Sequence, residues 1–273
     1  MVWTVKENYL LTAIRKGSIS EINQAIQDGA NVNAKDNDGW TPLMFVCDNN
    51  ASKEVIELLI DKGAKVNAKD DEGWTPLMFA LYYEAPKEVI ELLIAKSAKV
   101  NKKSNHGRTP LMYACDNPKN ITLEIIQLLL DHRAYINAKD EDDWTPLMYA
   151  CGRNASKKVI ELLIAKGAKV NAKDKVGRTP LMLAKEFNAS KGVIELLKKA
   201  EKAQFAALEA DLAKSKQEKA ALKANLAKSE QENANLKQKI DELTAQIAYN
   251  NFQAKKKEQQ RMTNVMLGKY RHK

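Results

Sequence analysis

The four residues Thr-Pro-Leu-Met occur five times along this chain of 273 residues, at nearly constant spacing. The intervals between successive copies are 34, 34, 36 and 34 residues, and the copies begin at Thr41, Thr75, Thr109, Thr145 and Thr179. A period of this size is typical of stacked structural units, each of which buries its apolar face against its neighbours. Such a stack presents a long continuous surface, which favours recognition over catalysis.

Each copy carries the local signals of two helices. Threonine followed by proline is a good helix start, because the hydroxyl can accept a bond from the first turn and proline needs no donor there. A second apolar run with helical spacing, such as Val55–Ile60, follows a Ser, Thr or Pro. Gly63 and Gly167 come after this run, where a left-handed residue is favoured. Ser97 and Arg133 take that place in the two middle copies, which predicts slightly weaker joints.

The segment after the second predicted helix reads VNAKD or a variant of it. An asparagine side chain can bond its own local backbone, so we expect it to fix a turn there. We expect the rest of the segment, up to the next Thr-Pro-Leu-Met, to be an extended loop or hairpin. The asparagines concerned are Asn33, Asn67, Asn101, Asn137 and Asn171.

Helix, turn, helix and loop, with Thr-Pro-Leu opening the first helix, resembles the ankyrin repeat over about residues 5–198. The resemblance implies an all-α ankyrin-repeat solenoid. The family usually has histidine after Thr-Pro-Leu, whereas this chain has methionine in all five copies. The hydrogen bonds that this histidine commonly makes must therefore be supplied otherwise or go unmade. Residues 5–35 lack Thr-Pro-Leu and look like the atypical capping unit that a stack needs at its end.

The predicted domain organisation has three parts. Residues 1–198 form the repeat domain, with the capping unit at about 5–35 and five repeats starting near 41, 75, 109, 145 and 179. Residues 199–250 are predicted to be a coiled-coil helix, because Val193–Leu267 contains no Gly or Pro and is rich in Ala, Lys, Glu, Gln and Leu. Residues 251–273 form a basic tail.

A heptad pattern without a skip fits the long predicted helix, and nine of its fourteen a and d positions are apolar. Asn233 at an a position favours a parallel dimer and fixes its register. The alternatives are a solvated single helix held by charge pairs four residues apart, or a helix folded against the stack. The residues predicted to mediate dimerisation are Leu208, Leu212, Leu222, Leu226, Asn233, Leu236, Ile240, Leu243 and Ile247.

A row of large side chains precedes the five Thr-Pro-Leu-Met copies. In ankyrin repeats, which this chain resembles, the position before Thr-Pro-Leu lies on the hairpin loop and faces the concave surface, where partners commonly dock. Trp, Tyr and Arg are also the residue types that dominate interface hot spots. The alternative is that each Trp packs on its neighbour and that Arg lies over it, which would stiffen the stack. The predicted partner-binding residues are Trp40, Trp74, Arg108, Trp144 and Arg178, with Tyr82, Tyr83 and Arg153 from the first helices.

The net charge of +9 is concentrated at the end of the chain, because residues 251–273 carry seven Lys or Arg and one Glu. Acidic residues flank the Trp positions in the loops, so we expect the partner to offer an apolar or basic segment. The main interpretation is an adaptor whose repeats bind a protein and whose coiled coil forms a homodimer. The alternative is a nucleic-acid- or membrane-associated adaptor anchored by the basic tail.

No catalytic pattern is visible in the sequence. Three histidines, His106, His132 and His272, are too few and too scattered for metal-ligand spacing, and the common nucleophile and phosphate-loop motifs are absent. We therefore expect no enzyme activity, no cofactor, no metal and no small-molecule substrate. An accessory subunit of an enzyme, whose catalytic partner docks on the coil, is a further alternative.

The three cysteines, Cys47, Cys115 and Cys151, all lie six residues after the Thr of a repeat. We expect them to be buried free thiols that fill the place of the family's alanine. Free thiols in odd number suit a reducing compartment, and the first residues lack the regions of a signal peptide. The sequence therefore predicts a cytoplasmic protein.

Overall fold

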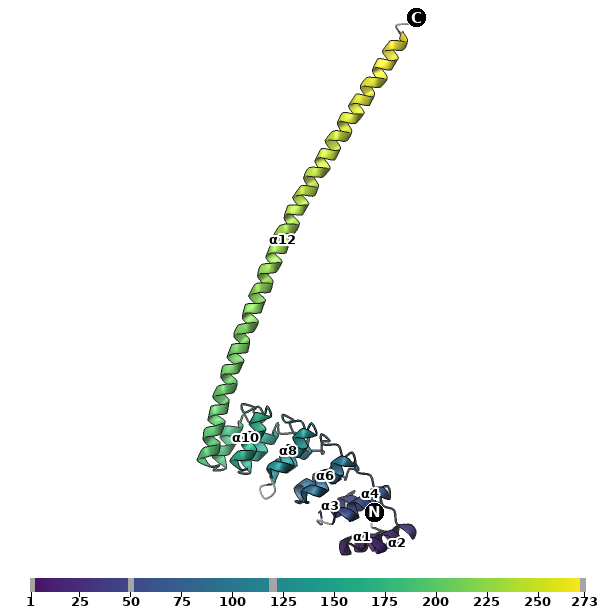
Figure 1. Ribbon diagram of the computed structural model, residues 1–273, viewed down its shortest axis with the longest axis vertical. Helices are drawn as coiled ribbons and strands as arrows, with labels where there is room; N and C mark the ends of the chain where they lie inside the picture. Colours follow the sequence, from purple (N-terminus) through teal and green to yellow (C-terminus); the bar gives the residue numbers. More distant parts are fainter. Residues whose placement is uncertain (1–2, 49–51, 118–121, 271–273) are drawn as a thin grey trace. The chain divides into compact units, whose positions relative to one another are not determined.

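The computed structural model describes residues 3–48, 52–117 and 122–270. Every regular element in these residues is an α-helix, and the chain divides into two compact units, residues 1–205 and 206–273. Figure 1 shows successive helix pairs along the first unit. The helices are α1 (Val5–Lys16), α2 (Ile19–Gln27), α3 (Pro42–Asp48), α4 (Lys53–Asp61), α5 (Pro76–Tyr82), α6 (Lys87–Ala95), α7 (Pro110–Asp116), α8 (Leu123–Asp131), α9 (Pro146–Gly152), α10 (Lys157–Ala165), α11 (Pro180–Glu186) and α12 (Lys191–Tyr270).

The predicted helix starts are confirmed in all five repeats. The first helix of each repeat begins at the proline of Thr-Pro-Leu-Met. The second begins directly after the predicted capping position, and in α8 and α10 the cap hydroxyl accepts a backbone N–H of the first turn. Local signals therefore set the helix boundaries. The capping positions are Ser52, Pro86, Thr122, Ser156 and Ser190.

The core of the first unit is built by like helices packing on like helices. The first helices α3, α5, α7, α9 and α11 contact one another in series, and the second helices α4, α6, α8 and α10 form a parallel series. The leucine and methionine of the first four Thr-Pro-Leu-Met copies are almost completely buried. Met182, in the fifth copy, is 53% exposed because no further repeat follows to cover it. Burial thus depends on having a neighbour on both sides.

The methionine sulfurs of the first four copies accept hydrogen bonds at the starts of the first helices. The backbone N–H of Thr41 donates to the sulfur of Met44 at 3.3 Å. The same bond, at 3.3–3.4 Å, joins the Thr and Met of the next three copies. A thioether is a weak acceptor, but it gives a buried amide a partner that water cannot supply.

Four of the five recurring asparagines bond the next repeat with their side chains and not their own local backbone, so the expectation of a local turn bond is wrong for them. Asn67 reaches the following repeat, where its amide donates to the carbonyl of Ser97 at 2.9 Å and its oxygen accepts the N–H of Lys99 at 2.8 Å. Asn33, Asn101 and Asn137 make equivalent pairs of bonds one repeat further along. These side chains therefore tie adjacent repeats together.

Gln204 of α12 binds the loop that follows α10. Its amide donates to the carbonyl of Ala168 at 2.9 Å, and its oxygen accepts the N–H of Val170 at 3.3 Å. Asn137 of the preceding repeat binds the adjacent groups of the same loop, the carbonyl of Gly167 and the N–H of Lys169. This loop is therefore bound both by the repeat before it and by helix α12 after it.

Helix α12 runs for 80 residues, so the last helix of the repeats continues into the long C-terminal helix as the sequence predicts. Its side chains from residue 206 to 252 are all exposed in the single chain. None of the helices in the described residues combines the length and the apolar character that a membrane crossing requires.

Candidate functional site: an aromatic and acidic surface on the loops

A tight loop precedes the first helix of each repeat and fixes the backbone of the Trp or Arg that stands directly before Thr-Pro-Leu-Met. In the second repeat, one carboxylate oxygen of Asp70 accepts the N–H of Trp74 at 2.6 Å, and the Asp70 N–H donates to the Trp74 carbonyl at 3.1 Å. Asp36, Asp140 and Asp174 hold the equivalent N–H in their own repeats, and Ser104 does so in the third. The loops are therefore rigid supports for the side chains that they present.

Neighbouring loops are also bonded to each other. The N–H of Asn105 donates to the carbonyl of Glu72 at 2.9 Å, and the loops of the other successive repeats are joined in the same way. Gly73 lies at this contact with a φ of +77°, and a Cβ there would come within 2.7 Å of the Asn105 backbone nitrogen. Only glycine fits this position, because it combines a left-handed backbone with a close approach.

An aromatic cluster covers the second and third repeats. The Phe79 ring lies 4.5 Å from the Trp40 ring and 5.3 Å from the Trp74 ring, measured between centroids. Trp74 also contacts Tyr113 at 4.3 Å and Tyr82 at 5.1 Å. Such contacts contribute about 0.5–1.5 kcal/mol each beyond the area they bury. The indoles are half-buried and pack against the core, as expected if they stiffen the stack.

A network of arginines and carboxylates covers the third, fourth and fifth repeats. The buried carboxylate of Asp116 pairs with Arg108 at 3.1 Å and with Arg153 at 2.6 Å. The Arg108 guanidinium also lies 4.7 Å from the centre of the Tyr149 ring and 3.9 Å from an oxygen of Asp140. A hydrogen bond from the Tyr149 hydroxyl to Asp140 completes the network.

Arg178 repeats this arrangement one unit further along. It pairs with the buried Asp174 at 2.8 Å, and its guanidinium lies 5.4 Å from the centre of the Trp144 ring. Burial acts to raise the pKa of Asp174, but hydrogen bonds from the Arg178 backbone and side chain outweigh it and lower that pKa. Asp174 is thus a charged carboxylate matched by a cation.

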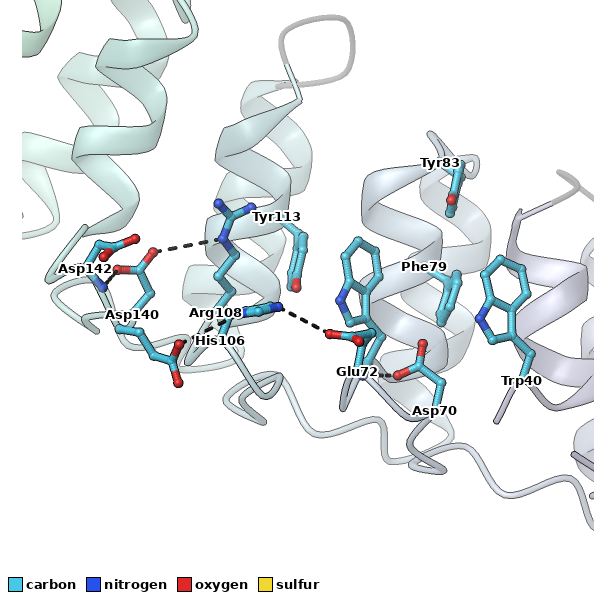
Figure 2. Close-up of a pocket in the computed structure, with 12 residues that line it drawn as sticks. Trp40, Asp70, Glu72, Phe79, Tyr83, His106, Arg108, Tyr113, Asp140 and Asp142 are labelled. Atoms are coloured by element: carbon cyan, nitrogen blue, oxygen red, sulfur yellow. Dashed lines mark hydrogen bonds and ion pairs between the residues drawn. The ribbon is translucent and has the colours of Figure 1, made fainter. Parts of the chain in front are cut away.

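The loops and first helices of the repeats form two adjacent grooves. The first groove has a volume of about 520 Å³, and Figure 2 shows its aromatic and acidic sides. Burial is the main cause that raises the pKa of Tyr113 in its wall to about 12, so this phenol stays neutral at physiological pH. The residues lining the first groove are Trp40, Asp70, Glu72, Trp74, Phe79, Tyr83, His106, Arg108, Tyr113, Asp140, Glu141 and Asp142.

The second groove lies among Trp144, Arg153, Arg178 and Phe187 and has a volume of about 340 Å³. Because Arg108 borders both grooves, the two are neighbours on one face of the repeats.

A family model described as "Ankyrin repeats (3 copies)" matches residues 10–104, 70–140 and 119–206 of the chain. These matches cover most of the chain and the whole stack of helix pairs. The protein belongs to the ankyrin repeat family. No curated protein matches the chain. Ankyrin repeats are protein–protein interaction modules, and the family is generally non-catalytic.

All eight residues of the predicted partner-binding set lie on this face of the ankyrin repeats. Trp40, Trp74, Arg108 and Tyr83 line the first groove, and Arg108, Trp144, Arg178 and Arg153 line the second. Tyr82 is 40% exposed and packs edge-on against Trp74. We call this set the aromatic–arginine surface.

The prediction omitted several residues that form the walls of the first groove. Phe79 and Tyr113 are almost fully buried members of the first helices, yet their rings line the groove. Each directly follows a Thr-Pro-Leu-Met copy, where four of the five copies carry an aromatic residue. That periodicity is the signal that would have found them. Asp140 and His106 were also omitted. Asp140 ends one of the recurring NAKD segments, so its periodicity was a signal too, whereas nothing local distinguishes His106 from an ordinary loop residue.

The predicted dimerisation residues lie on α12, in the second unit. The apolar members of the set are 55–72% exposed in the single chain. Asn233 is exposed as well. A row of apolar side chains at heptad spacing thus has no covering element within the described part of one chain.

The three cysteines are buried and none is in a disulfide, as expected. Burial raises the pKa of Cys151 to about 12, and it also raises the pKa of Cys115. Both thiols therefore stay protonated and unreactive near neutral pH.

Proposed function

We propose that the protein is an adaptor whose aromatic–arginine surface binds a segment of another protein. The two adjacent grooves carry this proposal, because they concentrate Trp, Tyr and Arg at hollows where partner side chains can be desolvated. The aromatic contacts between repeats keep these side chains in place before binding. A preformed surface of this kind loses little conformational entropy when a partner docks.

A pull-down with the full-length protein as bait tests this proposal. Tyr83→Ala removes a side chain that lines the first groove and is 39% exposed. Tyr135→Ala is the matched control, since Tyr135 is 65% exposed and lies outside both grooves. We expect partners that bind the wild type and Tyr135→Ala to be lost with Tyr83→Ala at equal helical content. Equal capture by all three proteins would refute the assignment of the surface.

We further propose that α12 pairs with α12 of a second copy to form a parallel dimer. Supporting this are the exposed heptad side chains and the charges beside them, because Asp211, Glu218 and Glu232 would face Lys216, Lys223 and Lys237 of the other chain. Two linked surfaces would gain affinity for a partner that offers two binding segments.

The second candidate function is attachment to nucleic acid or an anionic membrane through the basic tail. Favouring it are Lys255, Lys256 and Lys257, which are exposed on consecutive positions of α12, with Arg261 following. The last basic residues, Arg271 and Lys273, lie outside the described residues. Binding to duplex DNA or to phosphatidylserine vesicles that weakens with salt and disappears on truncation at Asn251 would support this candidate. Unchanged binding by the truncated chain would dismiss it.

A further inference from the structure

The carboxylates of the loop series differ in what neutralises them. Asp140 and Asp174 hold equivalent turns in the fourth and fifth repeats, and each has an arginine of this chain within 4 Å. Asp70 holds the same turn in the second repeat, yet no cation of the described residues forms an ion pair with it. The first groove therefore contains a loop carboxylate, Asp70, without the arginine partner that Asp140 and Asp174 have, as far as the described residues go.

Water can also stabilise the charge of Asp70 only weakly, because this carboxylate is mostly buried. It is only 9% exposed, and burial raises its pKa against the opposing effect of the Trp74 N–H bond. Asp70 lines the first groove together with Phe79 and Trp40, and Figure 2 labels these three side chains. Asp36, its counterpart in the first repeat, also lacks an ion pair in the described residues but is more exposed, so solvent can balance its charge. A buried carboxylate without a matching cation is costly, and an incoming cation would relieve that cost.

The walls of the groove select a flat cation. Within this chain, Arg108 and Arg178 each combine a carboxylate contact with an aromatic ring 4.7–5.4 Å away. The first groove offers the same two elements, a carboxylate at Asp70 and rings at Trp40 and Phe79. No arginine of the described residues pairs with Asp70, because Arg108 at the border of the groove is paired with Asp116. A guanidinium stacks on rings and is weakly hydrated, whereas a lysine ammonium is a compact and strongly hydrated charge.

The rim of the groove adds further negative charge. His106 lies between two carboxylates, 3.2 Å from Glu72 and 3.7 Å from Glu141, and Asp142 lines the same groove. The cation that borders the groove, Arg108, is already paired with Asp116. An approaching basic segment would therefore meet a favourable field before its side chain enters.

We infer that the first groove receives an arginine side chain of the protein partner, stacked on the Trp40 indole where it meets Phe79 and paired with Asp70. This inference rests on the proposed function and names the chemistry that the partner must offer. It also assigns to Asp70 a recognition role in addition to its role in the loop turn.

The probe is N-acetylarginine methylamide, added to the full-length protein while the indole N–H signals of the tryptophans are followed by NMR. We expect the signals of Trp40 and Trp74 to shift and that of Trp3 to stay unchanged. The citrulline analogue has the same shape without the charge, and it should bind about tenfold more weakly or worse. Equal binding of the two analogues, or no shift of Trp40 and Trp74, would overturn the inference.

Asp70→Asn keeps an oxygen that can accept the Trp74 N–H, so the loop should persist while the charge is lost. We expect it to weaken binding of the arginine probe about tenfold or more. Asp36→Asn is the matched control, because Asp36 makes the same turn bond to Trp40 and is not among the residues lining the groove. It should leave the affinity unchanged, and equal affinities of wild type and Asp70→Asn would contradict the inference.

Failure of this inference can be told apart from failure of the proposed function. If the arginine probe does not bind but Tyr83→Ala still abolishes partner capture, the surface binds a partner of different chemistry. If the probe binds through Asp70 but Tyr83→Ala leaves partner capture intact, the groove is confirmed while the assigned role of the surface is wrong.

Discussion

A left-handed residue follows the second helix in each of the first four repeats, and it shows how single positions adjust the joints between repeats. Gly63 and Gly167 adopt φ values of +92° and +93°, and Ser97 and Arg133 adopt +71° and +63° at the equivalent place. The carbonyls of all four accept bonds from the asparagine of the preceding repeat. The left-handed backbone is therefore required even where the residue type disfavours it, as the sequence predicts for the two middle joints.

We predict that Ser97→Gly stabilises the stack. The substitution removes the left-handed strain of a non-glycine residue and leaves the backbone bonds intact, so the free energy of unfolding should rise by about 0.5–1 kcal/mol. Gly63→Ala is the reverse control, since a Cβ there meets no atom within 4 Å and the whole cost is conformational. Urea unfolding measures both, and a loss of stability in Ser97→Gly would show that its side chain contributes more than the backbone strain costs.

At the scale of the element, α12 has two different environments along its length. Val193 and Leu197 are buried against the repeats, and Gln204 bonds the loop after α10. From residue 206 to 252 the side chains are exposed in the single chain. A solitary helix gains little from exposed leucines, whereas a pair of helices buries them at heptad spacing. The proposed dimer follows from this contrast and not from helix formation itself.

We predict that Asn233→Leu changes the oligomeric state of the full-length protein. A buried asparagine at an a position favours two parallel strands in register, so replacing it by leucine should allow larger assemblies or shifted registers. Asn235→Leu, two residues away and off the a and d seam, is the control and should leave the state unchanged. Sedimentation velocity distinguishes these species. A wild-type monomer at high protein concentration would end the dimer proposal.

For the whole molecule, the division into two units separates recognition from the proposed association. The repeats contact chiefly their immediate neighbours, and the aromatic–arginine surface is built entirely from them. Stability of such a stack arises from the repeats and from the interfaces between neighbours. The second unit should therefore be dispensable for the fold of the first.

We predict that a chain ending at Phe205 keeps the unfolding free energy of the repeats. A chain ending at Ala203 should be less stable by about 1–2 kcal/mol, because it lacks the two hydrogen bonds of Gln204 to the last loop. The two truncations differ by only two residues, so each is the control for the other in urea unfolding at one protein concentration. A large loss of stability already at Phe205 would show that the repeats need the second unit.

The sequence by itself determined the repeat register, the start of each helix and the face that carries Trp and Arg. These features follow from local signals, such as Thr-Pro at a helix start, copied at a regular period. The tertiary structure alone decided that Asn67 and its counterparts bind the next repeat, that Arg108 and Arg178 neutralise Asp140 and Asp174, and that Asp70 has no such partner among the described residues. The ring contact between Trp74 and Tyr113 was likewise decided by the tertiary structure alone. Most of these interactions join residues about one repeat apart. The Arg178–Asp174 pair is the exception, but its arginine lies over the Trp144 ring of the preceding repeat. Their geometry depends on how each helix pair is offset from the next, which no single repeat encodes.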